Sequence, residues 1–161
     1  MAKKILVAID GSEPSMKAVR YVGETVKGCK DVKIVLFSVL PEMPKGLDEL
    51  LGTDYVSVVP HIKERLGDLG QLRLRQEEEM KKALENAKEV LKSAGIPEKN
   101  IEIAVRRKKE GIAKDILREV ESGHYDTIVV GRRGISGAFF FGSVSDKVIK
   151  YAHNCAVWVI D

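Results

Sequence analysis

Residues 127–134, with the sequence TIVVGRRG, join an unbroken run of β-branched residues to a turn that contains two glycines. The run lacks the alternation of apolar and polar positions that marks a strand with one wet face. It is therefore typical of a strand buried on both faces of a parallel sheet. Runs of similar character lie at residues 5–9, 32–40, 101–105 and 156–160. Glu102 breaks the third of these runs, which we therefore expect at an edge of the sheet.

Segments with helical periodicity separate these runs, as crossover connections between parallel strands require. The first covers residues 14–26, and Ser12 is placed to cap its start. The second covers residues 73–94 and stops at Gly95, and the third ends before Gly123. The expected buried faces of the four helices contain, in turn, Ala18, Val19, Val22 and Val26; Met80, Leu84, Ala87, Val90, Leu91 and Ala94; Ile112, Ala113, Ile116, Leu117 and Val120; and Val144, Val148, Ile149 and Ala152.

The order βαβαβαβαβ predicts a single α/β domain that spans residues 1–161. Its expected architecture is Rossmann-like, with helices on both faces of a five-stranded parallel sheet. The connection at residues 41–72 is unusually long for such a fold. We expect an insertion there, and the sequence leaves open whether it is a lid, a partner-contact arm or an idle surface loop.

The charge balance gives no sign of a nucleic-acid partner. Lys and Arg number 27 against 24 Asp and Glu, which leaves a formal charge of +3 over 161 residues. The densest basic cluster, residues 106–109, is more typical of a solvated strand end than of a polyanion patch. No apolar stretch approaches the ~20 residues that cross a bilayer, and Cys29 and Cys155 match no paired-thiol or zinc spacing. We expect a cytoplasmic protein with no membrane partner.

Ligands of an open parallel sheet bind beyond the carboxyl ends of the strands. After residues 127–130, Gly131 and Gly134 allow a sharp turn whose successive backbone N–H groups could form an anion-binding nest. Gly142 and Ser143 lie at a helix start, where unpaired N–H groups and the helix dipole favour a phosphate. Ordinary turn chemistry would also explain the glycines, and helix capping would explain the serine. We favour a phosphate site because the four residues bracket one loop.

Other residues near this loop have two interpretations each. Asp10, at the end of the first strand, either contacts a ligand or its metal or caps its own turn. Arg132 and Arg133 could both add charge to a phosphate site, but adjacent side chains on a turn often point apart, so we expect one of them to face solvent. The phenylalanines at 139–141 are expected to anchor the loop rather than to stack on a base.

Several catalytic and cofactor motifs are missing from the sequence. It contains no G-x-x-x-x-G-K-[ST] loop, no G-x-G-x-x-G after the first strand and no G-x-S-x-G nucleophile elbow. His61, His124 and His153 have no metal-ligand spacing, so no protein metal site is predicted, and His124 is interpreted as a helix-end loop residue. No nucleophile is paired with a base, and we predict no catalytic residue.

Together these motifs resemble the universal stress protein family over nearly the whole chain. The matching segments are residues 5–12 (ILVAIDGS), 126–131 (DTIVVG), 142–148 (GSVSDKV) and the closing apolar strand. The resemblance implies the fold described as adenine nucleotide alpha hydrolase-like, with strand order 3-2-1-4-5. It also implies homodimers like those of many members, which pair through the last strand, here Ala156–Ile160.

ATP-binding members of the family carry the motif G-x2-G-x9-G-[ST], whose loop wraps the ribose and the phosphates. Here the seven residues 135–141 separate the second and third glycines, so the loop is two residues shorter than the motif. By resemblance, the adenine and ribose side is lined by Ala8, Ile9, Asp10 and Val39, and the phosphate side by Gly131, Gly134, Gly142, Ser143, Val144 and Ser145. Val130 and Arg133 complete the predicted nucleotide site.

The resemblance therefore implies a dimeric regulatory or stress-response protein that holds ATP, or else AMP or ADP, with Mg²⁺ accompanying the nucleotide. An alternative is a dimeric interaction module that has lost nucleotide binding, as the shorter loop and the insertion would allow. Weak ATP hydrolysis is a third hypothesis, with Asp10 as its candidate base.

Overall fold

Five strands form one parallel sheet in the computed structural model, which describes residues 2–42, 67–132 and 143–161. The strands are β1 (Lys3–Ala8), β2 (Val32–Leu40), β3 (Ile101–Arg107), β4 (Thr127–Gly131) and β5 (Ala156–Ile160). Every neighbouring pair is parallel, and the spatial order is β3-β2-β1-β4-β5. The predicted fold class and strand order are confirmed, and β3 lies at an edge as Glu102 indicated.

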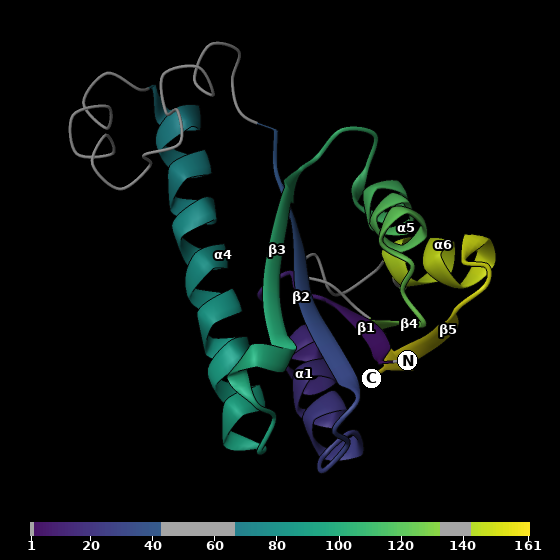
Figure 1. Cartoon of the computed structure of the whole chain (residues 1–161). Coiled ribbons are helices and arrows are strands. Elements are labelled where there is room, and N and C mark those ends of the chain that lie inside the picture. Colours follow the sequence, from purple (N-terminus) through teal and green to yellow (C-terminus); the bar gives the residue numbers. More distant parts are fainter. Residues whose placement is uncertain (1, 43–66, 133–142) are drawn as a thin grey trace.

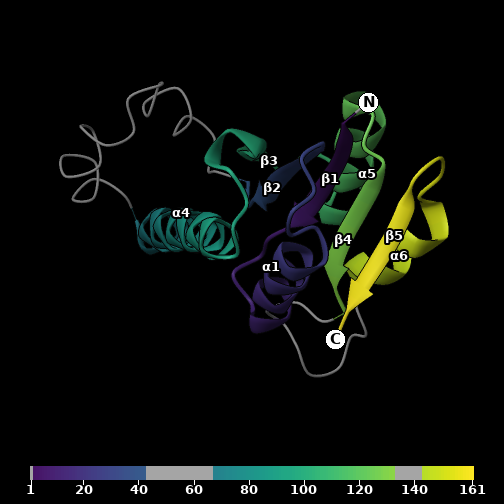
Figure 2. The same cartoon turned by 60° about the horizontal axis from the view of Figure 1, so that its bottom comes forward.

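Helices cover both faces of this sheet (Figure 1). One face carries α1 (Glu13–Thr25) and α4 (Asp68–Ser93), and the other carries α5 (Ile112–Gly123) and α6 (Ser143–Tyr151). A single 3-10 turn, η1 (Glu98–Asn100), leads into β3. Figure 2 shows the two helical layers on either side of the sheet. The N-terminus lies where β1 begins, at the amino ends of the strands, and the C-terminus lies where β5 ends, at their carboxyl ends.

Burial on both faces explains the uninterrupted apolar sequence of the central strands. In β2, Ile34 and Leu36 pack beneath α1 and α4, whereas Val35 and Phe37 pack beneath α5 and α6. All four side chains are fully buried. Each burial of this kind contributes about 1.5–3 kcal/mol, so a polar residue at any of these positions would weaken one of the two cores.

Local signals mark two helix boundaries correctly and miss a third by one residue. The Ser12 Oγ accepts a hydrogen bond from the Ser15 N–H at 3.3 Å, which confirms Ser12 as the cap of α1. Gly95 has φ +94°, as expected of the residue that ends α4. At the end of α5 the left-handed residue is His124, with φ 51°, and Gly123 is still helical. The sequence placed the stop one residue too early there.

The helix after the insertion begins earlier than its periodicity indicated. α4 starts at Asp68 instead of near Arg73, and it includes Gly70 in its first turn. Asp68 is favoured there because a carboxylate in the first turn complements the helix dipole. The tail of the predicted 41–72 insertion is therefore helical, while residues 43–66, the rest of that insertion, lie outside the described residues.

Two apolar residues assigned to the core are exposed instead. Ile112 is 46% exposed and Ile149 is 54% exposed. In α5 the buried row is Ala113, Ile116 and Val120, with spacings of three and four, and Ile112 flanks it at the first helical position. In α6 Val148 is fully buried, so the next residue points about 100° away from the sheet.

The structure also bears on three expectations drawn from composition. In the described part of the chain, no helix combines the length and apolar character that crossing a bilayer requires. Cys29 and Cys155 are both free thiols. Of the basic cluster, Arg106 pairs with Glu119 at 3.4 Å, Arg107 with Glu77 at 3.0 Å and Lys108 with Glu42 at 3.6 Å. These pairs fit the solvated strand end better than the polyanion patch.

Candidate functional site

The predicted adenine-side residues gather at the carboxyl edge of the sheet, but they do not all face the same way. Ala8, Val39 and Val130 pack in the core beneath α5 and α6, together with Val144 at the start of α6. Ile9 belongs to the opposite core, beneath α1 and α4, and its N–H donates to the Phe37 carbonyl at 2.8 Å. A ligand on the α5 and α6 face could therefore meet the backbone of Ile9 but not its side chain.

A hollow of about 530 Å³ opens beside this group, on the α5 and α6 face. The described residues that line it come from the β3–α5 loop, α5 and α6. They are Lys108, Glu110, Gly111, Ile112, Ala113, Lys114, Leu117, Ser143, Val144, Lys147 and Tyr151. Three lysines against one glutamate make this lining basic, which favours an anionic ligand. The hollow brings the predicted residues Ser143 and Val144 against the β3–α5 loop, which the sequence did not assign to the site.

A second hollow, of about 640 Å³, extends along α5 to the opposite ends of the same two helices, and it shares Glu110, Lys114, Leu117 and Tyr151 with the first. His124, Tyr125, Tyr151 and His153 are among the described residues that line it. It is larger, yet none of the predicted site residues in the described part of the chain borders it. We therefore assign the candidate site to the smaller, basic hollow at the carboxyl edge.

Asp10 caps its own turn, which is one of the two roles that the sequence allowed. Its Oδ1 accepts hydrogen bonds from the Ser12 N–H at 2.9 Å and from the Ser12 hydroxyl. Gly11, between them, has φ +80°, a conformation that favours glycine. The carboxylate thus orders the β1–α1 connection and orients the residue that caps α1.

Gly131 is needed for packing as well as for any turn. It is the last residue of β4, paired with Ile160, rather than the first residue of a loop. A Cβ at this position would lie 2.9 Å from the Pro14 Cβ and 3.0 Å from the Pro14 carbonyl carbon. The close approach of β4 to the first turn of α1 therefore requires glycine, a reason that periodicity could not reveal.

Ser145 fastens the first turn of α6 to the end of β4. The residue is 3% exposed, and its hydroxyl donates to the Arg132 carbonyl at 3.1 Å. The Arg132 N–H donates to the Ile160 carbonyl at 2.7 Å, and its exposed guanidinium lies 3.9 Å from the Asp161 carboxylate. Arg132 thus provides the solvent-facing arginine that the sequence predicted, while Ser143 is exposed at the helix start.

Four further predictions fall outside the described residues. They concern Arg133, Gly134, Gly142 and the phenylalanines at 139–141.

Within the described ranges no group of three or more His, Cys, Asp or Glu side chains could hold a metal ion. His124 and Asn154 are the non-glycine residues with positive φ in that part of the chain, at 51° and 58°. The structural interpretation of His124 as a helix-end residue is confirmed.

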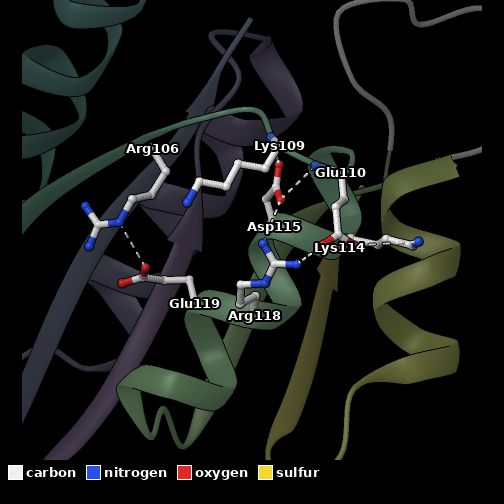
Figure 3. A network of polar contacts seen from close by, with 7 residues as sticks. All are labelled: Arg106, Lys109, Glu110, Lys114, Asp115, Arg118 and Glu119. Carbon is white, nitrogen blue, oxygen red and sulfur yellow. Dashed lines mark hydrogen bonds and ion pairs between the residues drawn. The ribbon is translucent and has the colours of Figure 1, made fainter. Parts of the chain in front are cut away.

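Asp115 is the residue that sequence reasoning missed. It lies in α5, its side chain is 6% exposed, and its carboxylate accepts the N–H groups of Lys109 at 2.8 Å and Glu110 at 3.3 Å (Figure 3). Burial opposes ionisation of this carboxyl, but hydrogen bonds from the backbone of residues 109–111, with Arg118 nearby, hold the pKa of Asp115 below its usual value. An acidic residue shortly after Gly111, near a helix start, was the available signal.

Comparison with known proteins agrees with the fold. The model of the universal stress protein family matches residues 1–161. The universal stress protein YxiE of Bacillus subtilis is 32% identical over 162 residues, covering 99% of this chain and 99% of its relative. A universal stress protein of Archaeoglobus fulgidus in complex with dAMP has a TM-score of 0.60 at 19% identity, covering 100% and 98% of the two chains. A family protein of Arabidopsis thaliana with AMP bound has a TM-score of 0.63 at 19% identity, covering 98% and 90%. This chain belongs to the universal stress protein family.

Proposed function

We propose that this chain binds an adenine nucleotide, ATP in the first place, in the basic hollow at the carboxyl edge of its sheet. The observation that carries the proposal is the meeting of Ser143 and Val144, at the start of α6, with the lysines of the β3–α5 loop and α5. Solved structures of proteins with the same fold contain AMP or dAMP. Binding near the end of β4 also follows the general rule for open parallel sheets.

The described residues divide the hollow into an apolar and a charged part. Ile112, Ala113, Leu117 and Val144 line the apolar part and offer surface for an adenine ring. Ala8, Val39 and Val130, at the ends of β1, β2 and β4, pack in the core together with Val144. Lys108, Lys114 and Lys147 line the hollow and offer charge to phosphate oxygens. Gly134 and Gly142 would join the phosphate side, as the family motif implies, and Arg133 could add charge there.

Magnesium fits this site as a companion of the nucleotide rather than as a resident ion. Mg²⁺ in nucleotide sites is held largely by phosphate oxygens and water, with one or two carboxylates. Within residues 2–42, 67–132 and 143–161 no cluster of three ligating side chains exists. Asp10 lies at the correct edge, but its Oδ1 is engaged by Ser12. We therefore expect phosphate oxygens of the nucleotide, together with water, to hold the Mg²⁺ ion.

Small molecules carried through purification test the proposal cheaply. The purified protein is precipitated with acid, and the supernatant is analysed by mass spectrometry for ATP, ADP and AMP. We expect adenine nucleotide in an amount that scales with the protein. Equilibrium dialysis of nucleotide-free protein against each compound then ranks the affinities for ATP, ADP and AMP. Repeated absence from the extract, together with no binding in dialysis, would favour the alternative of an interaction module without nucleotide.

We further propose that the chain acts in the cytoplasm as a homodimer paired through β5. This strand has β4 as its neighbour on one side and forms an edge of the described sheet. Its residues Val157–Ile160 are half-buried, and Trp158 packs edge-on against Tyr21, which is 48% exposed. A second copy could cover this apolar edge. Sedimentation velocity at micromolar concentration should give a dimer, and a monomer there would rule this pairing out.

Regulation through binding explains the site better than rapid catalysis does. The Asp10 carboxylate, the candidate base for hydrolysis, is engaged by its own turn. We expect the Asp10→Ala variant to leave any trace of ATP hydrolysis in a purified preparation unchanged. Loss of a hydrolysis rate that had survived extensive purification would instead assign the reaction to this residue.

A further inference from the structure

The β3–α5 loop is folded around one carboxylate. The Asp115 side chain accepts the N–H of Lys109 at 2.8 Å and the N–H of Glu110 at 3.3 Å. These hydrogen bonds join an ionised acceptor to backbone donors, which makes them stronger than bonds between neutral groups. The carboxylate thus occupies the concave side of the loop, where several N–H groups converge as they do around a bound anion.

The side chain of Glu110 adds a second connection between this loop and α5. It pairs with Arg118, and it also lies 3.8 Å from the Lys114 ammonium (Figure 3). Arg118 in turn lies 3.8 Å from the Asp115 carboxylate. Both the backbone and the side chain of the loop are therefore held by the first two turns of α5, with Asp115 as the buried member of the network.

The same loop forms one wall of the candidate nucleotide site. Lys108, Glu110 and Gly111 line the hollow together with Ser143 and Val144 from α6. The loop is fixed at its start, where the Lys108 N–H donates to the Leu40 carbonyl at 2.8 Å. Its middle is held by Asp115. Without that carboxylate the wall opposite α6 would lose its defined position, although the sheet and both helices would remain.

We propose that Asp115 is a positioning residue for nucleotide binding, which it serves by holding the β3–α5 loop against the start of α6. This inference rests on the proposed function. It assigns a role to a buried carboxylate that touches no nucleotide itself, and it makes the affinity of the site depend on a residue outside the glycine-rich loop.

The sign of the effect separates positioning from electrostatics. Asp115 is negative, so its removal near an anionic ligand would by charge alone strengthen nucleotide binding. A purely structural role would lower stability and leave the affinity of the folded protein unchanged. Loss of positioning weakens binding. The Asp115→Asn variant keeps the shape of the side chain and removes the charge. It also replaces one carboxylate oxygen with an NH₂ that cannot accept, so one of the two N–H groups loses its acceptor.

Asp126 provides the matched control. Its Oδ2 accepts the Lys4 N–H at 2.8 Å, and its Oδ1 lies 3.1 Å from the Lys3 ammonium, at the opposite edge of the sheet. It is likewise a carboxylate that orders backbone, yet it lies where β1 begins. The Asp126→Asn variant should lose stability and keep its nucleotide affinity.

The experiment measures ATP affinity by equilibrium dialysis at pH 7 for the wild type and both variants, with urea unfolding of each. We expect Asp115→Asn to bind about tenfold more weakly, as the loss of one charge-assisted hydrogen bond allows, and Asp126→Asn to match the wild type. Equal or tighter binding by Asp115→Asn would overturn the inference. So would an equal loss in the two variants. If the wild type binds no ATP, the proposed function itself is wrong. That result differs from one in which the wild type binds ATP and Asp115→Asn binds it equally well.

Amide resonances supply a second readout. In ¹H–¹⁵N spectra of the wild type, added ATP should shift the Lys109, Glu110 and Gly111 signals, because their loop lines the occupied hollow. In Asp115→Asn the same shifts should require about tenfold more ATP, in line with the dialysis. Binding of ATP that leaves these three signals unmoved would show that the loop is not part of the site, and it would overturn the inference.

Discussion

Asp115 and Asp126 have the same local role at opposite edges of one sheet. Each carboxylate accepts backbone N–H groups, from Lys109 and Glu110 in one case and from Lys4 in the other. The pKa of each is held below its usual value. They differ in what the ordered backbone does next, because one orders a loop that lines the basic hollow and the other orders the start of β1. We therefore expect similar hydrogen bonds to affect nucleotide binding at the carboxyl ends of the strands and only stability at the amino ends.

Replacing Gly131 should have the largest effect, because it changes the carboxyl edge itself. In the Gly131→Val variant the new side chain would meet the backbone of Pro14, which lies 3.0 Å from the added Cβ. We expect the free energy of unfolding in urea to fall by about 1–3 kcal/mol, as overpacking does elsewhere, and ATP binding to weaken with it. Gly131→Ala should lose less of both. Wild-type stability in the valine variant would show that β4 and α1 are not so closely packed.

Acid unfolding compares the two aspartates directly. A carboxyl whose folded pKa is lowered stabilises the fold above its unfolded pKa, about 3.9, and loses that contribution as the pH falls through the folded pKa. At pH 7 we expect both Asp→Asn variants to be less stable than the wild type, Asp115→Asn by about 1–3 kcal/mol. Below about pH 4 the gaps should close. Gaps that persist in acid would assign the stability loss to shape instead of charge.

Two serines at the start of α6 sharpen the comparison at the carboxyl edge. Ser145 is 3% exposed and donates to the Arg132 carbonyl, so Ser145→Ala should lower the free energy of unfolding by about 1 kcal/mol. Ser143 is exposed and lines the hollow, so Ser143→Ala should lower ATP affinity and change stability by less than about 0.5 kcal/mol. Urea unfolding and dialysis measure both. Identical behaviour of the two variants would contradict this division of roles.

The smallest effect is expected for a carboxylate held by a side chain alone. Glu102 pairs with Lys33 at 2.7 Å across β2 and β3, and both side chains are about half exposed, at 50% and 47%. Glu102→Gln should change the free energy of unfolding by less than about 1 kcal/mol, as for other exposed ion pairs, and leave ATP affinity unchanged. A larger loss of stability would mean that contact with backbone amides is not what makes Asp115 and Asp126 more important for stability than Glu102.

Burial patterns allowed most of the fold to be predicted, because strands covered on both faces need apolar residues at every position. The strand runs, the edge position of β3 and the Ser12 cap were all evident in the sequence. The family resemblance supplied the strand order. Ile112 and Ile149 were misassigned because both flank a buried row on a short helix, and hydrophobicity alone does not give the rotation of a helix on its sheet.

The candidate site was only partly predictable, for a different physical reason. Ser143 was predicted because a helix start after a glycine has a recognisable pattern, and Val144 was implied by the family resemblance. Asp115 and the packing role of Gly131 were missed because each depends on an approach between segments that are separate in the sequence. Gly131 meets Pro14 from the first helix, and Asp115 helps to form a wall that faces α6. Such distances exist only in the folded chain.

Calorimetric titration of ATP with Mg²⁺ into nucleotide-free protein tests the central claim most directly. Folded wild-type protein should give saturable heat at a stoichiometry of about one nucleotide per chain, as a single hollow of this kind would bind. The heat should weaken in Ser143→Ala and persist unchanged in Asp126→Asn. No heat at millimolar ATP from protein whose fold is verified by its cooperative unfolding would contradict the claim that the carboxyl edge is a nucleotide site.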